Sequence, residues 1–251
     1  MTNGGSKMIS RRINTTKLDI IQIGTKMFLE KGYSRTNTRE LCDALDISPG
    51  NLTFHFPTKE HLLSVLVDML CGFQSQTMER LVDEGKSSLM AFCLELMTMA
   101  AACEESESIR DFYVAAYTHP MTLEMIRKND ALRAKQIFGE FCQDWSDERF
   151  LEAETLISGI EYGTLMTTES SASLEFRIAG ALNGIMLIFG VPEDTRRMKI
   201  QKVLSMDYRA IGHQLIEDFI KYVDDTTEQA FEALIEERKR RRAAYKARHK
   251  Q

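Results

Sequence analysis

Two helix starts lie close together in the segment SPGNLTFHFPTKE, residues 48–60. Ser48 is a good N-cap, and Pro49 suits the first position of the helix that follows it. Thr58 is a second N-cap, while Pro57 disfavours helical backbone at the residue before it. The chain therefore has to complete one very short helix between these two starts.

The short helix is expected to run from Pro49 to about Phe54 or His55. Helical spacing places Leu52 and Phe56 on its inner face, and we expect Phe54 as well as Phe56 to pack in the core. The other face carries small groups of a size that can approach base edges in a DNA major groove: Pro49, Asn51 and Thr53.

Two further helices are expected before this segment. The first starts at Thr15 or Thr16 and stops near Gly32, a residue that suits a left-handed C-cap. The second has Thr38 as its N-cap and ends at about residue 45. Asp46 then supplies the left-handed conformation of a tight turn. Helix, tight turn and short helix together predict a helix-turn-helix arrangement.

The rest of the chain favours an all-α fold. Proline is scarce, at 4 of 251 residues, and good helix formers dominate. Stop and start signals predict a series of amphipathic helices. Their expected spans are 58–83, 87–104, 107–117, 120–143, 147–168, 173–190, 193–204, 208–224 and 226–247.

Several function classes are disfavoured by the sequence. We find no nucleophile motif, no phosphate loop and no metal-ligand spacing, so we expect neither an enzyme nor a cofactor. His55 and His61 lack the partners of a metal site. The N-terminus has no signal-peptide pattern, no apolar run is long enough to span a membrane, and five scattered cysteines fit reduced thiols. We therefore expect a cytoplasmic protein without membrane contact.

Charge is distributed unevenly along the chain. Residues 1–70 hold nine Lys/Arg and seven Asp/Glu, whereas residues 71–235 hold fifteen and twenty-eight. Residues 236–251 hold eight and two. An acidic body between a basic head and a basic tail indicates that these parts meet different partners.

Both basic ends have two interpretations. Lys7, Arg11 and Arg12 lie in a terminal arm that either enters a minor groove or stays solvated. The basic run of residues 238–242 is either a solvated helix end or a contact with DNA flanks, with the chain's own acidic surface or with an anionic partner.

Residues about 17–63 resemble the DNA-binding domain of the TetR/AcrR family of transcriptional regulators. The matching segments are IIQIGTKMFLEKGYSRTNTRELCDALDIS and PGNLTFHFPTKEHLL. The resemblance implies phosphate contacts at the start of the second helix and base contacts along the third. Carried over position by position, the implied DNA-contacting residues are Thr36, Thr38, Arg39, Pro49, Gly50, Asn51, Thr53, His55 and Lys59.

The sequence departs from the family pattern at three positions. Thr53 replaces a residue that is most often tyrosine, Asp46 replaces a more usual glycine, and Pro49 replaces a residue that is often basic. All three changes remove positive or long-reach contacts. They bear on the operator sequence and not on the class of protein.

The helical body is expected to bind an effector and to form a homodimer. Its methionine and aromatic side chains suit a cavity for a small apolar or amphipathic ligand, although each taken singly is more often plain core. The polar ligand candidates are Tyr113, Tyr117, His119, Glu161 and Tyr162. Gly159-x-x-x-Gly163 and Gly180-x-x-x-Gly184 are expected to allow tight helix crossings, and dimerisation is assigned to about 173–224.

These observations predict four segments and one function. The segments are an arm (1–14), a helix-turn-helix domain (15–61), a ligand-binding and dimerisation domain (62–225) and a basic C-terminal helix (226–251). The function is a ligand-responsive repressor that binds a palindrome in double-stranded DNA as a dimer. The alternatives are a helical small-molecule-binding protein or an interaction protein, each with a vestigial DNA-binding domain.

Overall fold

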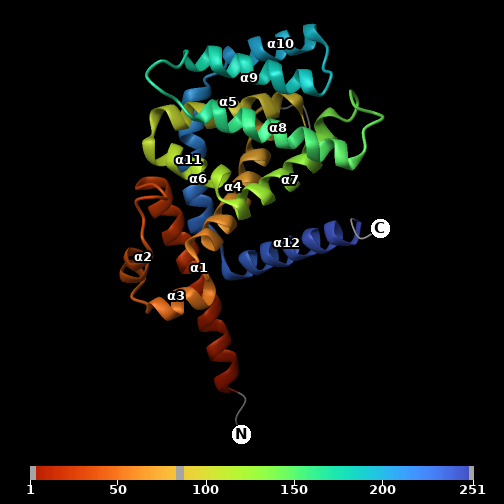
Figure 1. The fold of residues 1–251 in the computed structure, drawn as a ribbon. Coiled ribbons are helices and arrows are strands. Elements are labelled where there is room, and N and C mark those ends of the chain that lie inside the picture. Colours follow the sequence, from red (N-terminus) through yellow and green to blue (C-terminus); the bar gives the residue numbers. More distant parts are fainter. Residues whose placement is uncertain (1–3, 83–87, 249–251) are drawn as a thin grey trace.

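The computed structural model describes the backbone of residues 4–82 and 88–248, and the side chains of residues 17–82, 88–237, 239 and 240. The described backbone forms twelve helices and no strand (Figure 1). They are α1 (Gly4–Glu30), α2 (Thr38–Leu45), α3 (Pro49–His55), α4 (Lys59–Val82), α5 (Leu89–Glu105), α6 (Glu107–Thr118), α7 (Pro120–Phe138), α8 (Asp147–Leu165), α9 (Leu174–Ile188), α10 (Glu193–Leu204), α11 (Tyr208–Asp225) and α12 (Glu228–Arg248).

The helix-turn-helix arrangement is confirmed. Ser48 caps α3 by accepting a hydrogen bond from the backbone of Asn51, with Pro49 in the first turn. Asp46 adopts the left-handed conformation, with φ of 52°. The N-cap of α2 was predicted wrongly: it is Asn37, not Thr38. Asn37 forms a reciprocal capping box with Glu40, so two backbone donors are satisfied instead of one.

The helix-turn-helix domain of α1 to α3, here called the head, is joined through α4 to the helices that follow, here called the body. This helix starts beside α3 and continues into the body, as Figure 1 shows. α1 crosses α4 at Gly24, where a Cβ atom would lie 2.8 Å from Cδ2 of Leu62. The mid-helix glycine therefore allows the close approach that the sequence suggested.

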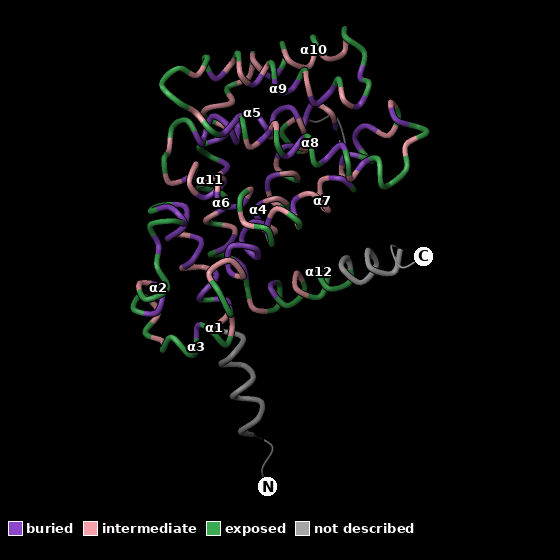
Figure 2. Tube along the Cα trace, viewed as in Figure 1, coloured by how far each residue is buried: buried purple, intermediate pink, exposed green. Residues whose placement is uncertain are grey.

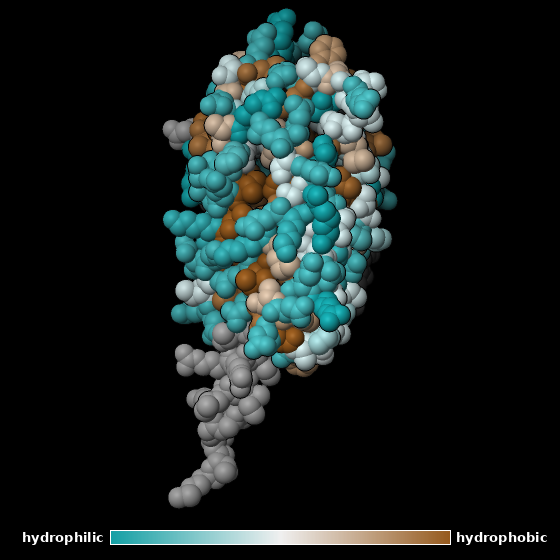
Figure 3. All heavy atoms as spheres, turned by 90° about the vertical axis from the view of Figure 1, so that its left-hand side faces the viewer, coloured by the Kyte–Doolittle hydropathy of each residue, from teal (hydrophilic) through white to brown (hydrophobic). Residues whose placement is uncertain are grey.

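Helix α5 is the centre of the body. It contacts α4, α6, α8, α9, α10 and α11, and most of its residues are buried (Figure 2). A helix that is apolar on all sides is expected to be surrounded in this way. The outer surface seen from the side of α2 is mainly hydrophilic, with hydrophobic residues in narrow patches between polar ones (Figure 3).

The close helix crossing in the body occurs at a glycine that the sequence did not single out. A Cβ atom on Gly212 in α11 would lie 2.8 Å from the backbone oxygen of Thr98 in α5. By contrast, a Cβ atom on Gly159, Gly163, Gly180 or Gly184 would have no neighbour within 4 Å. The prediction that these four glycines form tight crossings is therefore wrong within the chain.

Two helix limits differ most from the predictions. α1 starts at Gly4 instead of residue 15 or 16, so the expected arm is helical from residue 4. The side chains of Lys7, Arg11 and Arg12 lie outside the described residues. α7 ends at Phe138 instead of residue 143. The chain then turns: the backbone N–H of Cys142 donates to the carbonyl of Gly139, and the Cys142 thiol donates to the carbonyl of Phe189.

The remaining features concern the C-terminus and the surface. α12 leaves the body near the head, with Phe231 buried at its start. Most side chains of the basic run 238–242 lie outside the described residues. A search of the described part of the chain finds no helix long and apolar enough to cross a membrane.

Candidate functional site

The outer face of α2 and α3 presents small polar groups. Thr38, Arg39, Pro49, Gly50, Asn51 and Thr53 are all exposed, whereas Leu52 and Phe56 are buried beneath them. The Thr53 hydroxyl donates to the carbonyl of Pro49 at 2.8 Å, which leaves its methyl group and lone pairs outward. This face can approach a duplex closely because no long side chain rises between Asn51 and Thr53.

The prediction that Phe54 packs in the core is wrong, and this residue belongs to the exposed face of α2 and α3. It is 69% exposed, so it is not core. The helical period explains this, because a residue midway between the buried Leu52 and Phe56 points to the opposite side. An exposed ring beside Asn51 and Thr53 can contact the methyl group of thymine in a major groove.

Two residues of the implied DNA-contacting set, Thr36 and Lys59, form hydrogen bonds within the head instead. Thr36 is fully buried, and its hydroxyl lies 2.8 Å from the carbonyl of Gly32 and 3.2 Å from that of Met27. The Lys59 ammonium group donates to the carbonyls of Tyr33 and Thr36, both at 2.9 Å. These contacts fasten the α1–α2 turn to the start of α4.

His55 lies half-buried at the end of α3. Burial lowers its pKa, and the nearby Lys17 ammonium lowers it further. The imidazole is therefore neutral at pH 7. A neutral ring can donate one hydrogen bond to a phosphate but adds no positive charge. Arg39 is consequently the charged group that this face offers to a DNA backbone.

The head is fastened to α6 by polar contacts around one carboxylate. Asp111 accepts hydrogen bonds from the backbone N–H and the hydroxyl of Ser34, at 2.7 and 2.6 Å. Gly32 has φ of 100°, and a Cβ atom there would lie 2.8 Å from Asp111. Ser108 of the same helix donates to the carbonyl of Leu29 at 2.7 Å. A displacement of α6 would therefore move the α1–α2 turn.

The body contains a cavity of about 60 Å³ bounded by α4, α5, α6, α7 and α8. Most of its lining is apolar. Of the predicted ligand residues, Tyr113, Tyr117 and Glu161 line it, whereas His119 and Tyr162 do not. His119 instead packs edge-on against Tyr33 of the head, with ring centroids 5.2 Å apart.

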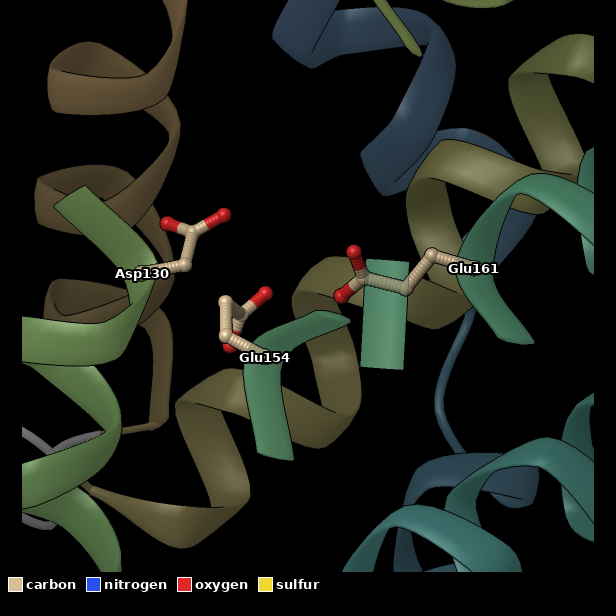
Figure 4. A group of neighbouring side chains, drawn as sticks. All are labelled: Asp130, Glu154 and Glu161. Carbon is tan, nitrogen blue, oxygen red and sulfur yellow. The ribbon is translucent and has the colours of Figure 1, made fainter. Parts of the chain in front are cut away.

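Three carboxyl groups converge on this cavity. They belong to Asp130 of α7 and to Glu154 and Glu161 of α8, and an oxygen of each lies within 4.8 Å of the others. Figure 4 shows them pointing toward one another between the two helices. Glu161 accepts a hydrogen bond from the Tyr117 hydroxyl at 2.9 Å. Asp130 and Glu154 were missed from the sequence, although Glu154 and Glu161 recur at helical spacing within a buried face.

Burial favours the protonated form of these groups. It raises the pKa of Glu161 to about 8 and that of Asp130 to about 7. It also raises the pKa of Glu154 well above its ordinary value, with a further contribution from the Asp130 charge. The neighbouring ion pair between Arg133 and Glu95 is mostly buried too. Glu161 therefore keeps its proton at pH 7, whereas Asp130 is about half ionised there.

These pKa shifts predict how stability depends on pH. Above about pH 5 the unfolded chain has lost protons that the folded protein still holds. The free energy of unfolding should therefore fall with rising pH, by about 1.4 kcal/mol per unit for each such group, and Glu161 should stop contributing above about pH 8. Glu161→Gln should flatten this dependence in urea unfolding between about pH 5 and about pH 8. Glu148→Gln, on the exposed start of α8, is the control. Equal slopes for the wild type and Glu161→Gln would contradict the assignment.

The N-terminal domain matches a known family. Residues 20–66 match the model of the bacterial regulatory proteins of the tetR family. This part of the chain is therefore a TetR-type DNA-binding domain. The match spans α1 from Ile20 through α2 and α3 to Leu66 in α4, the residues that build the exposed face described above. The described remainder of the chain is all-α.

Three solved structures illustrate what this chain is similar to. A gamma-butyrolactone receptor described as an ArpA-like protein is 22% identical, with 83% of this chain and 99% of that chain covered and a TM-score of 0.39. The TetR-family protein CprB from S. coelicolor A3(2) is 22% identical, with 84% and 98% covered and a TM-score of 0.35. Salmonella enterica GusR is 22% identical, with 70% and 95% covered and a TM-score of 0.40. No curated protein matches this chain significantly.

Proposed function

We propose that the protein is a cytoplasmic, effector-responsive repressor that binds a palindromic operator in double-stranded DNA as a homodimer. The exposed face of α3, which shows Asn51 and Thr53 above the buried Leu52, carries this proposal. Small polar groups there can reach base edges, while Thr38 and Arg39 at the start of α2 meet phosphates. The similarity of residues 20–66 to the tetR family favours a repressor over an activator.

An apolar face on α8 and α9 supports the dimer. On α9, Phe176 is 77% and Leu187 57% exposed, and Gly180 lies between them on the same side. On α8, Leu156 is exposed together with two glycines, and Met166 at the C-cap of this helix is exposed as well. The two helices are in contact, so they form one surface with small residues at its centre. This surface suits a second copy of the chain better than solvent.

Two helices support communication between the cavity and the DNA-binding face. α4 begins in the head, with Leu62 under α1, and its next turns bring Leu70 and Gln74 to the cavity wall. α6 lines the cavity with Tyr113 and holds the α1–α2 turn through Asp111. An effector that binds one arrangement of these helices better than the other shifts the population of head positions and so changes the affinity for DNA.

Selection from a random duplex library tests the DNA-reading role. At fixed near-physiological salt the wild type should recover a palindrome with half-sites about one helical turn apart. Asn51→Ala combined with Thr53→Ala should lose or change that consensus, because base contacts of this kind are each worth about 1–3 kcal/mol. Asp144→Ala, in the exposed turn after α7, is the matched surface control.

Recovery of no consensus would refute the sequence-reading role. Binding would then fade steadily as salt rises, as expected for contacts with phosphates alone. In that case the α2–α3 face would not read DNA sequence, and the protein would function by binding a small molecule in the cavity.

A further inference from the structure

We propose that the cavity between α4 and α8 takes an organic cation, an ammonium group that carries an apolar or aromatic body, with Glu154 as its counter-ion. This inference rests on the proposed function, because it names the chemical class of the effector.

The Glu154 side chain is unusual because it is buried without a full set of partners. It is 2% exposed, it lines the cavity, and its Oε1 atom is buried with no hydrogen-bond partner. A buried polar atom without a partner costs about 1–3 kcal/mol, and more when it is charged. A positively charged donor bound in the cavity would remove that cost. Glu154 therefore points to a missing cationic partner.

The charges around Glu154 leave the site acidic. The titratable and charged groups that act on the three converging carboxyls come from all five helices that bound the cavity. They are Cys71 on α4, Glu95 on α5, Tyr117 on α6, Arg127, Asp130 and Arg133 on α7, and Glu154 and Glu161 on α8.

Both arginines in this set have side-chain partners. Arg133 pairs with Glu95, although its Nε atom is buried without a hydrogen-bond partner, and Arg127 donates to the Ser158 hydroxyl at 2.9 Å. Asp130, Glu154 and Glu161 thus share a space in which a further positive charge is favourable. An anionic ligand would meet three carboxyl groups there and is disfavoured.

The rest of the lining distinguishes an organic cation from a metal ion. Phe92, Phe112 and Phe138 line the same cavity, together with aliphatic side chains. Aromatic faces attract ammonium groups and pack well against apolar bodies. A hard metal ion such as Mg²⁺ or Ca²⁺ takes about six or more oxygen ligands, several of them often water. Three carboxyl groups among apolar walls suit an ammonium group with an apolar body better.

Binding should be coupled to proton release. The pKa values of all three carboxyl groups are raised, and Glu161 holds its proton at pH 7. An ammonium group favours the ionised form, so at least one proton leaves when it binds. The affinity should therefore rise with pH between about pH 6 and about pH 8 by up to about tenfold per unit for each proton released.

Isothermal titration calorimetry of the full chain without DNA tests this proposal. The probes are benzylammonium and n-butylammonium, each compared with the alcohol of the same skeleton, and Mn²⁺ alone. Both amines stay protonated over the pH range used. At least one ammonium probe should bind about tenfold or more tightly than its alcohol, a difference of about 1.4 kcal/mol.

Two variants at the site and one control connect the binding to Glu154. Glu154→Gln keeps the shape of the side chain and removes its charge, so it should weaken ammonium binding by about tenfold or more. Asp130→Asn should do the same and covers the case in which Glu154→Gln fails to fold. Glu148→Gln removes an exposed carboxylate from the same helix and should bind like the wild type.

Three results would overturn the proposal. One is equal affinity for an ammonium probe and its alcohol, with no effect of Glu154→Gln, which would make the cavity merely apolar. Another is Glu154-dependent binding of Mn²⁺ without ammonium binding, which would make it a metal site. The third is no binding of either ammonium probe. Because the DNA selection uses the protein without ligand, a recovered palindrome would leave the regulator function standing in each case.

Discussion

We expect Phe176→Asp combined with Leu187→Asp to convert the protein from a dimer to a monomer and to abolish high-affinity operator binding. Both residues lie on the exposed apolar face of α9. Burying an apolar side chain of this size contributes about 1.5–3 kcal/mol. A two-fold interface contains each residue twice, so four side chains are lost, with roughly 6 kcal/mol or more of dimer stability.

The loss corresponds to about a 10⁴-fold weaker dimer. The effect on DNA follows, because a monomer holds one half-site only and loses the contacts with the second. Analytical ultracentrifugation measures the mass, and a salt-matched binding titration with the selected operator measures the affinity. Leu132→Asp, at an exposed leucine of α7, is the control and should leave both unchanged. A double variant that still sediments as a dimer would contradict the proposed interface.

The second large effect is expected at the buried ion pair beside the cavity. Arg133→Met should destabilise the folded protein by about 3–5 kcal/mol, because it leaves the Glu95 carboxylate buried without its partner. Urea unfolding followed by circular dichroism measures the change. Arg149→Met removes one partner of an exposed pair, with Glu152, and should cost less than about 1 kcal/mol.

A double variant separates the value of the pair from the cost of breaking it. Glu95→Leu combined with Arg133→Met replaces both charges by apolar groups. It should recover most of the loss, since a buried ion pair is often no more stable than well-packed apolar side chains. A double variant as unstable as the single one would show that Arg133 acts through packing or through Asp130 instead.

Local signals in the sequence predicted most of the secondary structure. The cap at Ser48, the proline at position 49 and the left-handed Asp46 each act over a few residues, so their effects could be read directly. The same holds for the limits of most body helices. Where two caps competed, as at Asn37 and Thr38, the sequence did not show which of them would form the reciprocal capping box.

The helical period also indicates which side chains of a helix are buried and which are exposed. It places Phe54 opposite the buried Leu52 and Phe56, and it places Glu154 and Glu161 on the buried face of α8. Composition misled in both cases, because an aromatic residue is usually core and a glutamate is usually solvated. The glycine spacings predicted the wrong helix crossings for another reason, because a close approach depends on which helix lies opposite the glycine. The close crossing occurs where Gly212 of α11 faces Thr98 of α5.

The helices, their order and the DNA-binding domain could thus be predicted, since caps, helical period and motif are local properties of the chain. The packing of the helices settles which side chains meet. It brought Asp130 of α7 to Glu154 and Glu161 of α8, and Asp111 of α6 to the α1–α2 turn. These contacts join residues distant along the chain, and they depend on how the helices pack, which no local pattern specifies.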